Sequence, residues 1–262
     1  MTQHGRPAMN VSLFAIPKIC VRVTQRCNLE CPFCLAPLYR GRELSVREIV
    51  SILGFLRHNG LRSVSISGGE PLLRDDLEEL LCNLRELDLD ITMATNAILV
   101  SAAQIEILQR TGCKVKVNLV GGESTHNALV GRDVFKTVDK NVKRLLMKQI
   151  PVGINTVVTR RNRQALGEVI SYAADNKISR VRFILFVPRG KGSLYEHEFA
   201  LTANQIREVE AEIERLRFIH SRNLSIRYSN YWIRFPYYVL ESDGRLVAEG
   251  PKEDNDVIIC QF

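Results

Sequence analysis

Alternation between two hydrophobic patterns is the feature that most constrains this chain. Short apolar runs rich in β-branched residues are each followed by a longer stretch with apolar residues at helical spacing, and this order occurs six times, at intervals of about 30 residues. It predicts parallel strands joined by right-handed helical crossovers. Six such units form either a doubly wound sheet or an incomplete barrel, and periodicity does not distinguish them. In both folds, functional residues gather where the strands end.

The predicted elements account for most of the chain. We expect strands at residues 19–24, 62–67, 90–95, 114–120, 152–158 and 180–187, and helices at 45–60, 75–87, 101–112, 133–149, 163–176 and 202–221. After residue 222 the helical spacing stops, and strands are expected at 224–229, in a hairpin that turns near 242–244, and at 256–262.

Composition and charge limit the class of protein. The chain has 262 residues, 45% of them apolar, which suffices for a sizeable core. Its apolar runs fall far short of the ~18 residues that span a bilayer, and residues 1–10 lack the apolar segment of a signal peptide. We therefore expect a soluble, cytoplasmic protein with no membrane partner. The net charge of +7 favours an anionic partner, such as a phosphorylated metabolite or RNA, although an ordinary basic surface explains it as well.

Three of the seven cysteines follow the first predicted strand with the spacing C-x3-C-x2-C; these are Cys27, Cys31 and Cys34. A disulfide scaffold is not expected at this length in a reducing compartment. Clustered thiolates instead suit zinc, copper(I) or an iron–sulfur cluster. Structural zinc takes four protein ligands, and no second C-x2-C is present, whereas three cysteines on a [4Fe–4S] cluster leave one iron open. The spacing favours the cluster and leaves zinc as the alternative.

Two further motifs adjoin this pattern. Phe33 precedes the third cysteine, and Ser-Gly-Gly-Glu-Pro at 67–71 closes the second predicted strand. With these motifs the sequence resembles the radical S-adenosylmethionine superfamily over residues 18–190. The resemblance implies an α/β fold, a partial (β/α)6 barrel with a short C-terminal β-rich extension. It divides the chain into an N-terminal extension (1–17), the barrel (18–222) and a C-terminal β extension packed on the barrel (223–262).

The resemblance also implies the chemistry. Cys27, Cys31 and Cys34 are expected to bind three irons of a [4Fe–4S] cluster, and S-adenosylmethionine is expected to chelate the fourth iron through its amino and carboxylate groups. An external donor such as flavodoxin or ferredoxin supplies the electron that cleaves the sulfonium. The resulting 5′-deoxyadenosyl radical then abstracts hydrogen from a substrate.

The same resemblance assigns cofactor contacts outside the cysteines. Besides Phe33, they comprise Gly68, Gly69, Glu70, Asn96, Asn118, Arg132 and Asn155. The two glycines let backbone approach a ligand where a Cβ would collide, and Glu70 is expected to meet the methionyl ammonium. The alternative interpretation of Gly-Gly-Glu-Pro is structural: these four residues form a tight turn from the strand into the next helix.

The remaining contacts come from the later strand ends. Asn96 lies in a Thr-Asn-Ala turn where the family has Thr-Asn-Gly, and a turn asparagine is its ordinary role. Asn118 stands where the family has serine, and Val120 replaces an acidic residue. Arg132, in a Gly-Arg pair, is expected to bind the S-adenosylmethionine carboxylate, with a solvated loop arginine as the alternative. Asn155 is expected to face the barrel mouth. The basic loop at 188–192 is either a receptor for a substrate phosphate or carboxylate or a mobile connection.

What the C-terminal part lacks limits the reaction. Molybdenum-cofactor cyclases and peptide-modifying members of the resembled family carry extra cysteines for auxiliary clusters, whereas only Cys260 follows Cys113 here. We therefore expect a single cluster, which argues against both of those activities. Cys260 is either a hydrogen donor that quenches a substrate radical or an inert, buried thiol. The aromatic run at 228–238 forms a substrate wall or packs beneath the barrel.

Three functions remain open. The first is an enzyme that rearranges, epimerises, cyclises or dehydrogenates a small-molecule, nucleotide or short-peptide substrate in a biosynthetic pathway. The second is an activase for a glycyl-radical enzyme, whose partner is a protein. The third is a zinc-bound nucleic-acid module, favoured only by the net charge; a nucleic-acid partner is otherwise not expected.

Overall fold

The computed structural model describes residues 16–38, 41–232 and 237–262. Residues 1–10, which lack the apolar segment of a signal peptide, lie outside these ranges, as does most of the expected N-terminal extension. Part of the aromatic run, 233–236, also lies outside the described residues. Within the run, the rings of Tyr231 and Tyr237 pack edge to face with centroids 5.6 Å apart.

Seven parallel strands form the main part of one sheet and follow each other in chain order. They are β1 (Lys18–Arg22), β2 (Ser63–Ser67), β3 (Asp90–Thr95), β4 (Lys114–Asn118), β5 (Val152–Val158), β6 (Arg180–Leu185) and β7 (Ser225–Ser229). The expected α/β fold is confirmed. The strand expected at 224–229 is β7, and it joins the parallel series beyond the six expected strand–helix units, because the last long helix returns the chain beside β6 by the same kind of crossover as the others.

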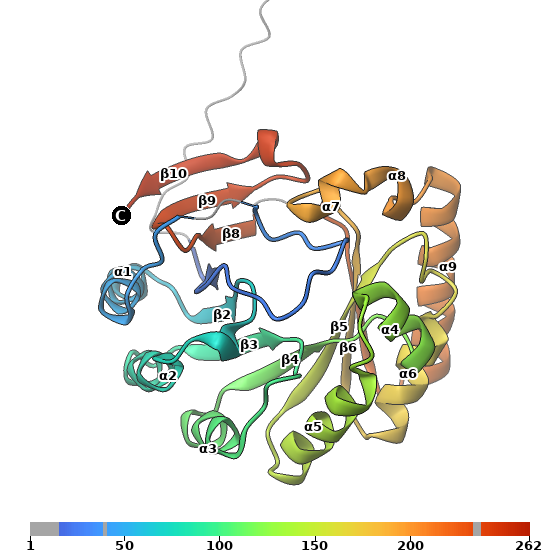
Figure 1. Ribbon diagram of the computed structural model, residues 1–262, viewed down its shortest axis with the longest axis horizontal. Coiled ribbons are helices and arrows are strands. Elements are labelled where there is room, and N and C mark those ends of the chain that lie inside the picture. The colour runs from blue at the N-terminus through green and yellow to red at the C-terminus, as the bar shows by residue number, and fades with distance from the viewer. Residues whose placement is uncertain (1–15, 39–40, 233–236) are drawn as a thin grey trace, which may run out of the picture.

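Three C-terminal strands extend the sheet at its other edge. They are β8 (Tyr237–Leu240), β9 (Arg245–Glu249) and β10 (Val257–Gln261). β8 pairs parallel with β1, and β9 and β10 follow as antiparallel neighbours. The first strand of the chain therefore lies between β2 and a strand that begins more than 200 residues later (Figure 1).

The helices cover the outer side of the curved sheet (Figure 1). They are α1 (Val46–His58), α2 (Leu77–Glu86), α3 (Ala102–Thr111), α4 (Glu123–Val130), α5 (Phe135–Met147), α6 (Leu166–Asp175), α7 (Lys191–Leu194), α8 (Glu196–Phe199) and α9 (Ala203–His220). The Ser45 hydroxyl and Glu48 carboxylate form the capping box that starts α1. None of the helices in the described part of the chain combines the length and apolar character needed to cross a bilayer.

The two faces of the parallel strands differ sharply. Alternate residues point to opposite sides of a strand; on the outer side, Val64, Ile66 and Val115 join the main core with helix residues such as Leu80 and Leu84. The other side, called the inner face below, bears small, polar and basic side chains. Its register-matched positions include Ser65, Thr92, Lys116, Asn155 and Arg182.

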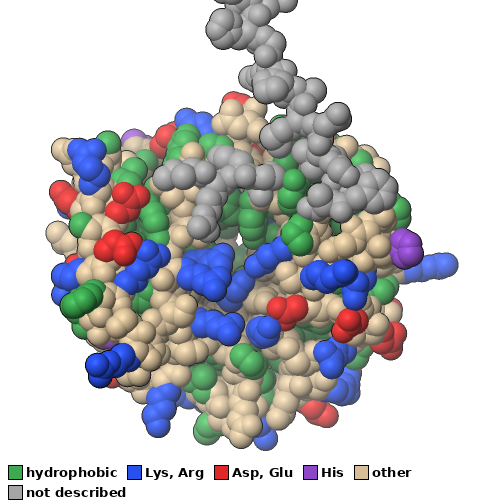
Figure 2. Space-filling view, turned by 180° about the vertical axis from the view of Figure 1, so that it is seen from behind, with side chains coloured by type: hydrophobic (Ala, Val, Ile, Leu, Met, Phe, Trp, Pro, Cys, Tyr) green, Lys and Arg blue, Asp and Glu red, His purple; other side chains and the backbone are tan. Residues whose placement is uncertain are grey.

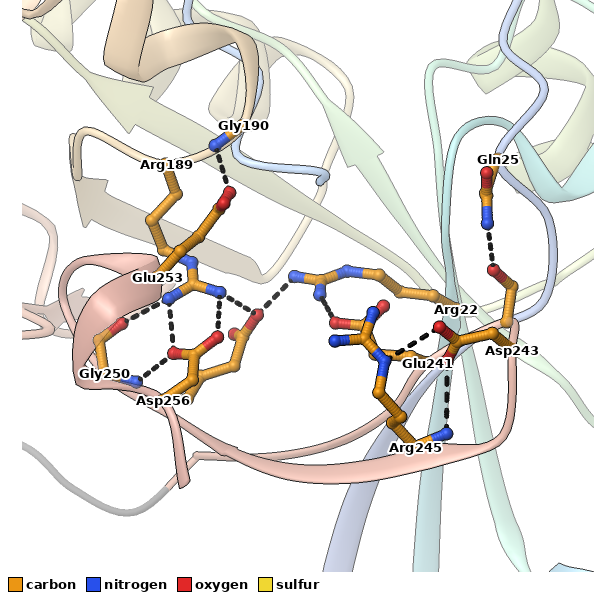
Figure 3. A network of polar contacts seen from close by, with 12 residues as sticks. Arg22, Gln25, Arg189, Gly190, Glu241, Asp243, Arg245, Gly250, Glu253 and Asp256 are labelled. Atoms are coloured by element: carbon orange, nitrogen blue, oxygen red, sulfur yellow. Dashed lines mark hydrogen bonds and ion pairs between the residues drawn. The ribbon is translucent and has the colours of Figure 1, made fainter. Parts of the chain in front are cut away.

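A buried ion network fastens the C-terminal strands to the barrel (Figure 3). Arg22 of β1 pairs with Glu241, which follows β8, and donates to Glu249 of β9 at 2.6 Å. Arg189, after β6, donates to Glu249 at 3.1 Å and to Asp256 at 2.7 Å. Burial disfavours the charge on Arg22, but the carboxylates of Glu249 and Glu241 outweigh it, so the pKa of Arg22 lies above its ordinary value.

A buried histidine on α4 makes stability depend on pH. The His126 side chain is 2% exposed, and its Nδ1 accepts from the Val120 backbone N–H at 3.4 Å, which requires a neutral ring. Burial lowers the pKa of His126 to about 4. An unfolded histidine titrates near ~6.5, so between about pH 6.5 and 4 only the unfolded chain gains this proton and stability falls as the pH falls.

We expect His126 to contribute a loss of about 3 kcal/mol in the free energy of unfolding across that window. Urea denaturation at a series of pH values measures the total loss, and the imidazole resonance of His126 should titrate near pH 4 in NMR spectra. A resonance that titrates near ~6.5 would show that the ring is solvated in the native protein.

Candidate active site

The three clustered cysteines lie in the segment after β1, residues 23–38, called the cysteine loop below. Cys27 is exposed, and Cys31 and Cys34 are half-buried. The Cys34 backbone N–H donates to the Cys31 carbonyl at 3.2 Å, which closes a turn between these two cysteines. The Leu29 N–H approaches the Cys27 sulfur at 3.4 Å. Backbone geometry thus orients the loop around its thiols.

The thiols lie close enough to repel one another when ionised. Burial, then the neighbouring Cys34 and Cys27, raise the pKa of Cys31 to about 12, and burial is the main cause that raises the pKa of Cys27. A bound cation offsets such repulsion and holds thiolates deprotonated. Three thiolate sulfurs that require a bound cation are the donor set of an iron–sulfur cluster. The three cysteines therefore fit such a cluster.

The distances between possible metal ligands help to distinguish a single metal ion from a cluster. Within the described ranges, no three His, Cys, Asp or Glu side chains already converge on one point as ligands of a single ion. In a [4Fe–4S] cluster each thiolate binds a different iron, so the sulfurs of three ligands stay apart.

The Gly-Gly-Glu motif packs directly on the start of the cysteine loop. The Gly69 N–H donates to the Thr24 carbonyl at 2.7 Å, and the Glu70 N–H donates to the Arg26 carbonyl at 2.8 Å. A Cβ on Gly68 would lie 2.3 Å from the Thr24 carbonyl oxygen, and one on Gly69 would lie 2.1 Å from that of Arg26. The two glycines therefore leave space for the backbone of the cysteine loop, in addition to any contact they make with a ligand.

Glu70 joins the ends of β2 and β3. Its side chain is 1% exposed and accepts from the Thr95 hydroxyl at 2.6 Å and from the Asn96 N–H at 2.8 Å. Burial raises the pKa of this carboxyl, and the hydrogen bonds from Thr95 and Asn96 oppose that rise. Ala97, which replaces the glycine of the resembled Thr-Asn-Gly turn, adopts φ 58°, the left-handed conformation that glycine favours.

Asn28 connects the cysteine loop to two predicted site residues, Asn96 and Arg132. Its side-chain oxygen accepts from the Asn96 amide at 2.7 Å, and its backbone carbonyl accepts from the Arg132 guanidinium at 2.7 Å. Asn96 and exposed Arg132 thus both hold the residue that follows Cys27. Sequence reasoning did not single out Asn28, because a contact through a backbone carbonyl leaves no residue-type signal.

Phe33 anchors the third cysteine by packing. The ring is 8% exposed and belongs to a second apolar cluster with Val120, Val134 and Phe186. Its centroid lies 6.1 Å from that of Phe199. This burial holds the segment before Cys34 against α8 and the loop after β6, and the predicted cofactor contact of Phe33 stays a prediction.

The last two strand-end candidates lie together, whereas Cys260 lies elsewhere. Asn118 and Asn155 are register partners on β4 and β5, both on the inner face. Cys260 sits half-buried on β10, opposite Leu246 of β9, and two strands separate β10 from β1. The structure therefore brings the two asparagines together but does not bring Cys260 to the cysteine loop.

The basic loop after β6 finds its partners inside the chain. Arg189 is 1% exposed and held by the ion network, and the Lys191 ammonium donates to the Glu30 carbonyl at 3.0 Å. The Gly192 N–H donates to the Cys34 carbonyl at 2.9 Å. A Cβ on Gly190 would lie 2.0 Å from the Ala36 carbonyl oxygen. This loop braces the cysteine loop, and its arginine is engaged by carboxylates of the chain.

Comparison with known proteins agrees with this arrangement. Among curated proteins, the chain is similar to a probable GTP 3′,8-cyclase of Saccharolobus islandicus (strain M.14.25 / Kamchatka #1), at 30% identity over 246 residues, covering 92% of this chain and 75% of that protein. It is also similar to the GTP 3′,8-cyclase of Petrotoga mobilis, at 30% identity over 200 residues, covering 72% of this chain and 61% of that protein.

Solved structures share the fold. Streptococcus suis SuiB bound to S-adenosylmethionine has a TM-score of 0.71 and 20% identity, covering 88% of this chain and 57% of that chain. The enzyme anSMEcpe with bound AdoMet and a peptide has a TM-score of 0.72 and 18% identity, covering 89% of this chain and 74% of that one. Residues 21–173, more than half of the chain, match the Radical SAM superfamily. The resemblance seen in the sequence is confirmed: the chain belongs to the radical S-adenosylmethionine superfamily.

Proposed function

We propose that this enzyme binds one [4Fe–4S] cluster through Cys27, Cys31 and Cys34. Members of its superfamily use such a cluster with S-adenosylmethionine. When bound, the two groups supply a 5′-deoxyadenosyl radical, which here abstracts hydrogen from a small-molecule, nucleotide or short-peptide substrate. The observation that supports this most is the direct packing of the Gly-Gly-Glu motif on the cysteine loop.

The chain's own residues have separate tasks in this proposal. The carbonyls of Thr24 and Arg26 and the glycines that pack on them fix the start of the loop that carries the three thiols. Glu70 and Asn96 hold the ends of β2 and β3 together, and the Asn96 amide ties them to Asn28 of the cysteine loop. Arg132 supplies a positive charge on the other side of Asn28. A guanidinium suits the carboxylate of an amino acid group, so Arg132 is the residue proposed to meet that end of S-adenosylmethionine.

Substrate and partners are less constrained. The GTP 3′,8-cyclase relatives make GTP the first candidate, and the peptide complexes of SuiB and anSMEcpe add short peptides. Residues 114–262 hold a single cysteine, so we propose that residues 1–262 bind one cluster. We further propose an external one-electron donor and a cytoplasmic location. The family match leaves no support for a zinc-bound nucleic-acid module.

The first test is cleavage of S-adenosylmethionine. Anaerobically reconstituted protein should hold about four irons and form 5′-deoxyadenosine with dithionite. Replacing one cluster ligand, Cys31→Ala, should reduce 5′-deoxyadenosine formation by at least about 100-fold, because a missing ligand uncouples the cluster from the cofactor. Cys82→Ala, at a half-buried cysteine of α2 outside the loop, is the matched control and should retain normal iron and activity. Normal cleavage by the Cys31→Ala protein would refute the proposal.

A further inference from the structure

Four basic side chains on the inner face lack partners. Lys18 lies on β1, Lys116 on β4, Arg182 on β6 and Arg227 on β7. Among the described residues, none of these side chains has a hydrogen-bond or ion-pair partner, whereas Arg22 on the same sheet pairs with Glu241 and Glu249. Figure 2, seen from behind the view of Figure 1, shows lysine and arginine side chains gathered around the centre of that side of the molecule.

These four cations share one space. Lys18 interacts electrostatically with Arg182 and Arg227, although β2 to β5 lie between β1 and β6 in the sheet. The sheet is curved, so this electrostatic interaction acts across the inner space. Lys116 in turn interacts with Lys18 and Arg182, and the strand register places Arg182 directly beside Arg227.

The positions beside Lys116 are small. Its register partners are Ala94 on β3 and Gly153 on β5. Neither carries a side chain longer than a methyl group, so neither covers nor pairs with the ammonium. The serines of β2 at 63, 65 and 67 continue this small, polar lining toward β1. The inner face therefore combines unpaired cations with short neighbours.

The local charge is far from balanced. Asp90 on β3 is the carboxylate that interacts with Lys18 and Lys116, and its oxygen already pairs with the Lys114 ammonium at 2.7 Å. Burial first, and then Lys18 and Arg182, lower the pKa of Lys116 to about 8, while Cys20 and Asp90 act in the opposite direction. Positive charges held together without counter-charges favour a ligand that supplies several negative charges.

We propose that Lys18, Lys116, Arg182 and Arg227 form a subsite for the oligophosphate group of a small-molecule substrate. This inference rests on the proposed function and names the substrate class. A single carboxylate offsets one of the four charges, whereas a di- or triphosphate offsets three or four. Two of the cations are guanidinium groups, whose planar forks bind phosphate oxygens in pairs.

The subsite lies at a useful distance from the cysteine loop. Lys18 is four residues before Arg22, the last residue of β1. At ~3.3 Å per residue the two ends of β1 are about 13 Å apart. An elongated phosphate ester with its phosphates on the four cations therefore reaches the end of β1, where the cysteine loop begins. The phosphates serve as the anchor, and the reacting carbon lies at the other end.

The test measures binding of tripolyphosphate and of citrate by titration calorimetry to the reconstituted full-length protein. Tripolyphosphate should bind at least about tenfold more tightly than citrate, and Lys116→Gln and Arg182→Gln should each weaken it about tenfold or more. Lys143→Gln removes an exposed lysine of α5 and is the matched control, with binding expected to stay as in the parent protein. Circular dichroism melting should show that all three variants are folded.

A pH series adds a readout specific to Lys116. Tripolyphosphate affinity should fall as the pH rises above about 8, where Lys116 loses its proton, and this fall should be absent in Lys116→Gln. Equal binding of citrate and tripolyphosphate, or unchanged binding by both inner-face variants, would overturn the subsite. Because binding is measured without turnover, protein that cleaves S-adenosylmethionine but fails these tests disproves only the subsite, and the converse result disproves only the proposed reaction.

Discussion

Gly69→Ala is expected to destabilise the protein by about 3 kcal/mol or more and to abolish iron retention at the cysteine loop. The added Cβ would lie 2.1 Å from the Arg26 carbonyl oxygen, and that carbonyl also accepts the Glu70 N–H at 2.8 Å. Because backbone opposes backbone, no side-chain rotation relieves the overlap. The loop must move away from β2, and its thiols move with it. Urea denaturation and iron content after reconstitution measure both effects.

Gly167→Ala provides the matched control. Gly167 lies inside α6, and a Cβ there would meet nothing within 4 Å. Alanine is the better helix former by up to about 1 kcal/mol, so this variant should be as stable as the parent protein or more stable. Equal urea midpoints for Gly69→Ala and the parent protein would mean that the motif does not pack on the loop.

Glu249→Gln is expected to lower the free energy of unfolding by about 3 kcal/mol. The Glu249 side chain is fully buried and accepts from Arg22 at 2.6 Å and from Arg189 at 3.1 Å. Removing its charge takes away the one carboxylate that bridges the two guanidinium groups and leaves each with a single carboxylate partner, Glu241 for Arg22 and Asp256 for Arg189. Neither guanidinium can deprotonate to relieve the loss. Chemical denaturation followed by circular dichroism measures the change.

The control for this prediction is a surface ion pair. On α9, Nε and Nη2 of Arg215 each donate to a Glu212 carboxylate oxygen at 2.7 Å, and the pair lies at the surface, with the Arg215 side chain 59% exposed and that of Glu212 34% exposed. Exposed pairs contribute about 0–1 kcal/mol, so Glu212→Gln should have an effect within about 0.5 kcal/mol. If Glu249→Gln were as mild as Glu212→Gln, the C-terminal strands would not depend on the ion network for their attachment.

Local pattern predicted the parallel strands well and the short helices poorly. The strands expected at 90–95 and 152–158 have those bounds in the structure, because β-branched runs bounded by turns carry their own signal. Helix α4 was missed: it has only eight residues, and Gly122 at its start offers no capping side chain. The pairing of β8 with β1 was also missed, since periodicity within a segment says nothing about a partner so distant in sequence.

The candidate site divides in the same way. The cysteine and glycine motifs were recognisable because their residue types are tied to chemistry and to backbone space. Their mutual packing was not, because it runs through the carbonyls of Thr24 and Arg26. Arg22 gave no signal either: within its strand it reads as an ordinary exposed position, and its partner Glu241 lies 219 residues away.

The position of β8 has a consequence for synthesis of the protein. During translation β1 is made early, but β8, the strand that covers its open edge, is made more than 200 residues later. Until then Arg22 lacks both carboxylates that neutralise it, and the strand that leads into the cysteine loop has an unpaired edge. Domains with such distant pairings complete their folding late. A nascent chain that stalls before residue 237 should therefore be open to proteases at β1, and synthesis of residues 237–262 should close this edge.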